Sequence, residues 1–247
     1  MDFDIVIPVG PHDVDRILHQ LEFTRHNIIG YRNIYLISSA VLDVSGCQYI
    51  PESIFPFSLS SVAEIHGASS RNGWYLQQLL KLYAGQIIPG ILPRYLIVDA
   101  DTHFLHPTSF ISPEEKPMYA VGEEYHIPYF SHMQKLHPTF RKMHASHSGI
   151  CHHMVFDTML LQEMFTMVEE HHSKRAPFWK LFLDCVTPDN YKLSGASEYE
   201  IYFNYLLQYH STDIQVRPLR WRNATRLNVP DDSKKYDFVS CHWYMRH

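Results

Sequence analysis

Long hydrophobic runs are missing from this sequence. Of its 247 residues 45% are hydrophobic, yet no apolar run approaches the ~20 residues that a membrane-spanning helix needs. The opening segment 1–8 has neither a basic stretch nor a long apolar stretch, so a secretory signal peptide is not expected. These absences predict a protein without a transmembrane segment, and we expect a cytoplasmic location.

Paired cysteines and a surplus of basic residues are also absent. The four cysteines contain no CxxC pair, so neither a zinc knuckle nor a disulfide framework is indicated. With 21 Lys and Arg residues against 26 Asp and Glu residues, the formal net charge is −5. Nucleic acid is therefore not an expected partner, because general nucleic-acid binders normally carry a basic surplus.

The patterns that are present indicate an α/β fold. Strand, helix and strand follow one another at the start of the chain, in the order of a parallel βαβ unit. The expected strands lie at 3–9, 34–37, 94–98, 118–121, 150–156, 214–218 and 236–241. The expected helices lie at 14–21, 74–84 (closed by Gly85), 157–171, 177–185 and 198–209, with a partly helical stretch at 123–147. No linker or repeat is visible, so 1–247 is expected to form one domain.

Two carboxylates follow the expected strand at 94–98. Asp99 and Asp101 are one residue apart, and in an open α/β sheet ligands bind at the carboxyl ends of the strands. Two acids at one place repel each other, and a divalent cation is the usual solution, because Mg²⁺ or Mn²⁺ takes carboxylate oxygens together with substrate phosphates. The alternative is that both side chains end the strand and cap the next turn.

The order of the motifs resembles a known family. The D-A-D string, after an I-V-I-P-V strand and a βαβ half, resembles GT-A-type glycosyltransferases, which use nucleotide-diphosphate sugars. The strings R-N-G-W-Y-L-Q-Q-L-L-K-L-Y-A, H-S-G-I and S-E-Y-E-I-Y-F-N-Y resemble an uncharacterised glycosyltransferase-like subgroup. The resemblance implies a single GT-A-like (Rossmann-like) domain with a mixed, mostly parallel central sheet flanked by helices. Residues 1–101 would form its nucleotide-binding half and 102–247 its acceptor-side half.

The resemblance implies a nucleotide contact at the loop after the first strand. This loop contains Pro8, Val9 and Gly10, and a glycine lets the backbone approach a ligand closely. A plain turn that ends the strand is the alternative.

Further donor contacts are expected in two later segments. Arg71 precedes the helix at 74–84, where a guanidinium and helix-terminal amides can hold phosphate, although a solvated arginine is the alternative. Gln77 is the helix side chain chosen to face the donor. The resemblance also implies that Ser148 and Gly149 line the sugar pocket, against the alternative of a turn that needs glycine.

The resemblance gives the two acids and a late histidine separate roles. Asp99 would face the ribose or the metal, and Asp101 would bind the metal. His242 follows the last expected strand and is the candidate third ligand, with a structural histidine as the alternative. Imidazole suits Mn²⁺ better than Mg²⁺, so the expected cofactor is Mn²⁺, or else Mg²⁺.

Glu198 is the candidate catalytic base. Ser197 and Glu200 have the S-x-x-E spacing of a capping box, which leaves Glu198 free to point at a ligand. An inverting sugar transfer needs a carboxylate that takes the proton of the acceptor hydroxyl. The helix start would lower the pKa of Glu198, and burial would raise it. The competing pair is Glu123 and Glu124, and a surface acid favoured by the helix dipole is the alternative.

Together these features predict a metal-dependent glycosyltransferase that moves a sugar from a nucleotide-diphosphate donor to a glycan or other hydroxyl acceptor. A nucleotide-sugar hydrolase on the same scaffold would use the same site with water as acceptor. A non-catalytic carbohydrate-binding protein would use the 16 Tyr and 4 Trp residues as stacking platforms, but it would not need two acids after a buried strand.

Overall fold

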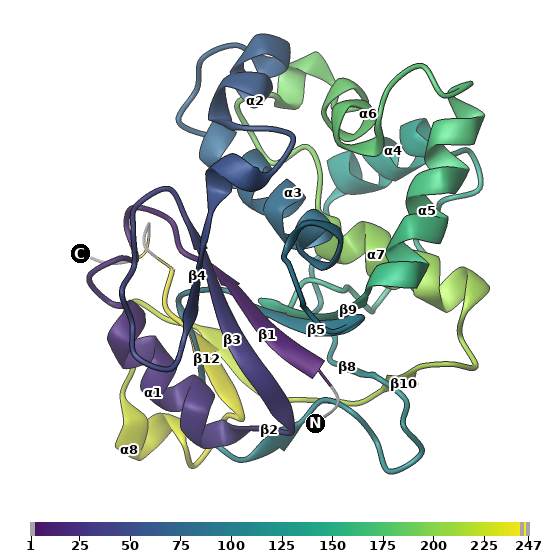
Figure 1. The fold of residues 1–247 in the computed structure, drawn as a ribbon. Coiled ribbons are helices and arrows are strands. Elements are labelled where there is room, and N and C mark those ends of the chain that lie inside the picture. The colour runs from purple at the N-terminus through teal and green to yellow at the C-terminus, as the bar shows by residue number, and fades with distance from the viewer. Residues whose placement is uncertain (1–2, 243–244, 246–247) are drawn as a thin grey trace.

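The structure is a computed structural model that describes residues 3–242 and 245 (Figure 1). Its central sheet has the strand order β4-β3-β1-β5-β9. All neighbouring strands are parallel except β5 and β9, which are antiparallel. The strands are β1 (Phe3–Pro8), β3 (Tyr31–Ser38), β4 (Gln48–Pro51), β5 (Arg94–Val98) and β9 (His153–Asp157). The predicted α/β class with a mixed, mostly parallel sheet is confirmed.

Helices pack against this sheet and against each other. α3 (Asn72–Ile87) contacts β1, β5 and β9, and it also contacts α5 (Thr158–His171) and α7 (Glu198–Tyr209). Figure 1 shows these helices gathered on one side with α2 (Leu59–His66), α4 (Ile127–Leu136) and α6 (Phe178–Asp184). Among the described residues, no helix combines the length and the apolar character needed to cross a membrane.

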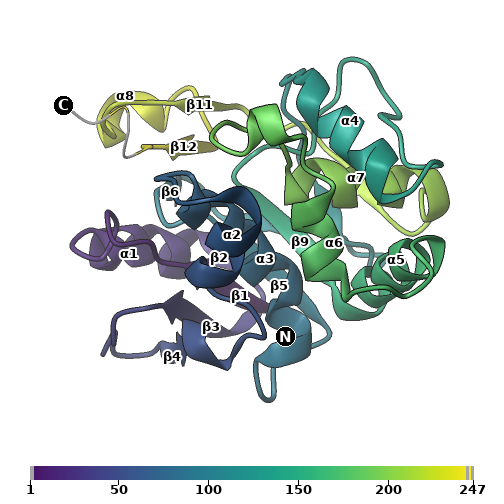
Figure 2. The same ribbon diagram turned by 90° about the horizontal axis from the view of Figure 1, so that it is seen from above.

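A small sheet brings the end of the chain back to the middle of the sequence. Its strand order is β11-β12-β6, and β12 (Phe238–Ser240) is parallel to β11 (Trp221–Asn223) but antiparallel to β6 (Thr102–Phe104). Figure 2 shows β11, β12 and α8 (Val229–Asp232) at the opposite end of the molecule from α5. Because β6 begins directly after Asp101, β12 brings the C-terminal segment close to the two acids.

The other short elements are α1 (Ile17–Asn27), β2 (Ile28–Ile29), β7 (Thr108–Ser109), β8 (Met118–Tyr119), β10 (Gln215–Val216) and the 3-10 turns 52–54 and 188–190.

Strand register gathers four segments at one edge of the central sheet. Val6 of β1 lies opposite Ile97 of β5, so the carboxyl ends of these parallel strands coincide. Val98 lies opposite His153, the first residue of antiparallel β9. The segments after β1, β3 and β5 and the segment before β9 therefore meet at this edge. This is where a ligand is expected in an open α/β sheet.

Gly85 corrects one sequence prediction. The helix expected to close there continues to Ile87. A Cβ atom at Gly85 would lie 2.2 Å from Thr158 Oγ1 and 2.6 Å from Tyr95 Cε1. The glycine is needed because α3 packs closely on its neighbours, and it does not mark the end of the helix.

Candidate active site

Asp99 lies in a buried network of charges. Lys81 from α3 places its Nζ 2.6 Å from Asp99 Oδ1 and 2.7 Å from Glu198 Oε1 at the start of α7. The Tyr199 hydroxyl donates to the same Asp99 oxygen at 2.9 Å. The side chains of Lys81 and Glu198 are only 4% and 5% exposed, so the ammonium is shared between two acids away from bulk water.

The charges in this network shift its pKa values in opposite directions. Burial alone would raise the pKa of Asp99, but the Lys81 ammonium and then His152 outweigh it and hold the pKa below its ordinary value. Burial raises the pKa of Glu198, and Lys81 offsets only part of that effect. Burial would lower the pKa of Lys81, but the two carboxylates raise it. The ammonium is therefore firmly charged, and Glu198 is the more easily protonated acid.

The geometry corrects two expectations about α7. Glu198 does not point freely at a ligand, because Lys81 engages its Oε1, and burial rather than the helix dipole dominates its pKa. Ser197 caps the helix by accepting from the Glu200 amide at 3.2 Å. The Glu200 carboxylate, however, accepts from Ser148 Oγ at 2.7 Å and the Gly149 amide at 3.0 Å. The donors of Ser148 and Gly149 are thus used inside the protein, which differs from the predicted contact with a sugar.

Asp101 faces the end of the chain instead. Its Oδ2 lies 3.1 Å from His242 Nδ1, and His242 Nε2 lies 3.1 Å from Asn223 Oδ1 of β11. The structure thus brings Asp101 and His242 together, while Asp99 turns toward Lys81. Among the described residues, no group of three or more His, Cys, Asp or Glu side chains converges as a metal site. The three predicted ligands therefore do not form a closed cluster.

His152 lies between the two acids. Its Nδ1 is 3.5 Å from Asp99 Oδ2, and its ring centroid is 4.6 Å from that of His242. The backbone has φ 64°, a left-handed conformation that is uncommon for residues other than glycine. Strained backbone of this kind is stored mainly at functional sites, at a cost of roughly 1–3 kcal/mol. The strain directs the ring toward the edge where both acids lie.

The comparisons with known proteins can now be set beside this geometry. The sequence model of a family of unknown function (DUF6492) matches residues 27–223. The chain belongs to this family. No curated protein matches the sequence. The structure is similar to the crystal structure of mouse xyloside xylosyltransferase 1 in its apo form, with a TM-score of 0.45, 14% sequence identity and 97% of each chain covered. A likeness of this degree leaves the activity of the chain open.

The remaining predicted donor contacts of this DUF6492 protein lie before α3, within α3 and after β1. Val9 donates its amide to Ile37 at 2.8 Å, and the Gly10 carbonyl accepts from Asp13 at 3.0 Å, so Pro8, Val9 and Gly10 form an ordered turn at the ligand edge. Gln77 is half-buried. The glutamine that reaches α7 is Gln78, whose side-chain oxygen accepts from the Glu198 amide at 3.0 Å.

Arg71 lies far from the two acids along the helix. It precedes α3 by one residue, ten residues before Lys81, which corresponds to about 15 Å of helix rise. Its Nε donates to the Leu193 carbonyl at 3.2 Å, Nη2 contacts Ser194 Oγ, and the guanidinium stacks 4.0 Å from the Trp74 ring centroid. This placement differs from the predicted contact with the donor phosphates.

Sequence reasoning missed Lys81, Tyr199, His152 and Asn223. A signal for Lys81 was present, because it is a lone charge inside the apolar run L-L-K-L and lies one helical turn after Gln78. The family match contains all four positions, together with Asp99, Asp101 and Glu198, but it ends before His242.

Proposed function

We propose that this DUF6492 protein is a metal-dependent glycosyltransferase of the GT-A type, which transfers a sugar from a nucleotide-diphosphate donor to a hydroxyl acceptor. The observation that carries the proposal is the approach of Asp101 to His242 at the ligand edge of the sheet, 3.1 Å apart. The two residues are far apart in sequence, and β12 brings them together beside the buried network of Asp99. The predicted cytoplasmic location belongs to the same proposal.

The donor atoms of Asp101 and His242 fit a divalent cation. Two ligands at right angles on an ion with bonds of about 2.1 Å lie about 3.0 Å apart, close to the observed 3.1 Å. A neutral imidazole that binds through Nδ1 must carry its proton on Nε2, and Asn223 Oδ1 is placed to accept a hydrogen bond from Nε2–H. Asp99 fits less well, because Lys81 and Tyr199 already bind its Oδ1. Asp101 and His242 would therefore hold the metal.

A bound Mn²⁺ or Mg²⁺ would act as a Lewis acid toward the leaving diphosphate. The protein's own residues have distinct tasks. Lys81 fixes the positions of Asp99 and Glu198 relative to each other, because one ammonium bridges both carboxylates. Glu198 accepts the proton of the acceptor hydroxyl, and its raised pKa makes it a better base than an exposed glutamate. The turn of Pro8, Val9 and Gly10 lies at the same edge and would contact the nucleotide.

A thermal-shift screen of UDP, GDP and their sugar derivatives, with and without Mn²⁺, tests the proposal. Ligand binding to the native state raises the melting temperature by mass action, so we expect a rise that needs both nucleotide and metal. Asp101→Asn should lose this rise and, in an assay of sugar transfer, at least about a hundredfold in kcat. Asp213→Asn is the control, because that side chain is 66% exposed and lies on the loop after α7.

Three outcomes would redirect the proposal. If Asp101→Asn keeps full metal-dependent activity, the assignment of the metal ligand is wrong. If product analysis shows only the free sugar, whether or not an acceptor is added, the protein is a nucleotide-sugar hydrolase. Glycan binding without metal-dependent nucleotide binding would identify a carbohydrate-binding protein.

A further inference from the structure

A hollow in the surface lies next to the start of α7, outside the cluster of acids. Its volume is about 430 Å³. It lies between the N-terminal end of α3 and the segment that leads into Glu198. The residues that line it are Arg71, His126, Asn190, Lys192, Leu193 and Ser194.

The wall of this hollow is held in place by hydrogen bonds. The Tyr75 hydroxyl donates to the Asn190 carbonyl at 2.8 Å and accepts from the Gly195 amide at 3.1 Å. His126 Nε2 lies 2.8 Å from the Ser194 carbonyl, which joins the 190–195 segment to the start of α4. A hollow built on a fixed wall binds its ligand without first ordering a loop.

The charge of the lining is positive. Arg71 and Lys192 carry permanent charges, and none of the six described lining residues is acidic. Glu123, Glu124 and Asp189, which neighbour lining residues in sequence, are exposed and lie outside the lining. Such a hollow favours an anion, because a guanidinium and an ammonium both bind phosphate and carboxylate oxygens.

Exposed apolar side chains occur in this lining and next to it in sequence. Leu193 is 59% exposed, and Tyr125 and Ile127, on either side of His126 in sequence, are 61% and 66% exposed. Large exposed apolar side chains that gather around a polar hollow mark a binding surface more often than an ordinary surface. An aromatic ring beside charged groups suits a sugar that carries an acidic group.

The position of the hollow connects it to the proposed reaction. Ser194 precedes Glu198 by four residues, so their Cα atoms are at most about 14 Å apart. A group held by Lys192 is therefore within the length of a short oligosaccharide from the candidate base. Arg71 lies on this side of the molecule and not beside Asp99.

We propose that this hollow binds a phosphate or carboxylate group carried by the sugar acceptor. That the bound group belongs to the acceptor rests on the function proposed above, whereas the anion site itself rests only on the hollow and its charges. Arg71 thereby serves the acceptor, in place of the donor diphosphate.

Isothermal titration with glucose 6-phosphate, glucuronate, inorganic phosphate and neutral glucose tests the anion site. We expect the charged sugars to bind and neutral glucose to bind much more weakly. Lys192→Gln should weaken their binding about fivefold, as expected for one exposed cation. Leu193→Asp, at an exposed position, should abolish binding by placing a negative charge at the hollow. The stronger of the two charged sugars identifies phosphate or carboxylate as the preferred group.

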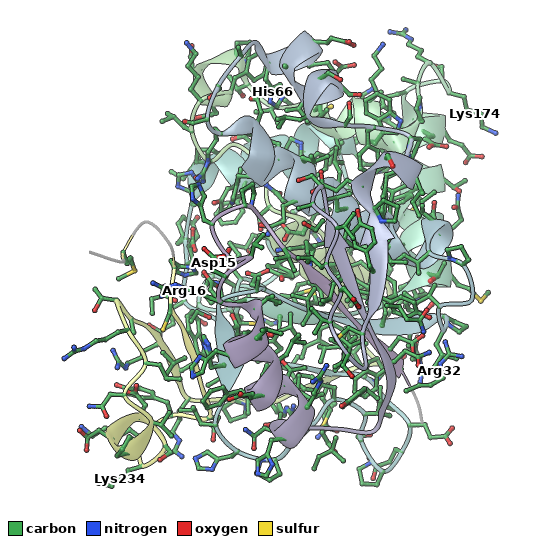
Figure 3. The ribbon with its side chains drawn as sticks, turned by 60° about the vertical axis from the view of Figure 1, so that its left-hand side comes forward. Asp15, Arg16, Arg32, His66, Lys174 and Lys234 are labelled. Atoms are coloured by element: carbon green, nitrogen blue, oxygen red, sulfur yellow. The ribbon has the colours of Figure 1, made fainter. Side chains whose placement is uncertain are left out.

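Lys174→Gln is the matched control, because this lysine is 71% exposed, lies at the periphery of the molecule (Figure 3) and does not line the hollow. Equal binding of the charged sugars by wild type, Lys192→Gln and Leu193→Asp would overturn the inference. So would equal binding of neutral glucose and its charged derivatives. The nucleotide screen with Mn²⁺ is read separately. If anions bind in a Lys192-dependent way but no nucleotide binds, the proposed function fails and the anion site stands.

Discussion

Asp99 and Asp101 are separated by one residue in sequence, yet their carboxylates face different partners. Asp99 is neutralised by Lys81, a permanent cation whose side chain is 4% exposed. Asp101 faces His242, an imidazole that becomes cationic only by taking up a proton. The first acid therefore belongs to a network that is complete without a ligand. The second lies outside that network, beside His242.

The largest test of this difference is to remove the shared ammonium. Lys81→Met leaves Asp99 and Glu198 buried without their counter-charge, and breaking a buried ion pair in this way costs about 3–5 kcal/mol. We expect a loss of that size in the free energy of unfolding, measured by urea denaturation. Asp101→Asn should cost about 1 kcal/mol or less, because asparagine keeps a side-chain oxygen that can accept a hydrogen bond from the imidazole.

Two further variants control this measurement. Lys174→Met removes a lysine that is 71% exposed and should change the free energy of unfolding by less than about 0.5 kcal/mol. Adding Glu198→Gln to Lys81→Met should restore part of the lost stability, because one of the two unpaired charges is removed. If Lys81→Met proves as stable as the wild type, the network does not hold the two acids together.

The same comparison shows how far the sequence predicts the fold. Helical spacing placed α5, α6 and α7 within one residue of their observed bounds, because each has a clear apolar face or a cap. Local patterning did not indicate α2 or β4, which lie in the weakly patterned stretch 40–68. Gly85 misled because the sequence shows a missing side chain but not the tyrosine and threonine that occupy its place.

The site was less predictable than the fold for a physical reason. The edge of the sheet, the acids after β5 and the histidine after β12 follow from local patterns, and the structure places Asp101 beside His242 but turns Asp99 toward Lys81. The partner of Asp99 does not follow from local patterns. Lys81 reaches Asp99 from α3, and the position of α3 depends on how it packs against the sheet and α7. Two adjacent acids do not by themselves require a metal ion here, because the ammonium of Lys81 balances the charge of Asp99.

Asp99 and Glu198 should contribute to the acid dependence of stability in opposite ways, with smaller effects than the loss of Lys81. The pKa of Asp99 is lowered in the folded state, so its stabilising contribution is present above its unfolded pKa and is lost as the pH falls through the folded value. The pKa of Glu198 is raised, so its contribution has the opposite sign: folding is favoured at low pH, and stability declines as the pH rises through the folded pKa.

Two variants should therefore change, in opposite directions, how steeply the free energy of unfolding falls at acid pH. Asp99→Asn should flatten the loss of stability below about pH 5, and Glu198→Gln should steepen it. Urea denaturation at several pH values measures both slopes. Slopes that change in the same direction in the two variants would mean that one of the two pKa directions is wrong.

The smallest expected effect on stability belongs to Gly10, at the same edge of the sheet. Its φ lies outside the left-handed region, and an added Cβ atom would meet no atom within 4 Å, so alanine fits the folded chain. Gly10→Ala should raise the free energy of unfolding by about 0.4–1 kcal/mol, because alanine restricts the unfolded chain more than glycine. If the turn contacts the nucleotide as proposed, the added methyl group weakens nucleotide binding in the same protein that it stabilises. A variant that is more stable and binds the nucleotide as well as the wild type would remove Gly10 from the donor site and leave the roles of Asp99 and Asp101 intact.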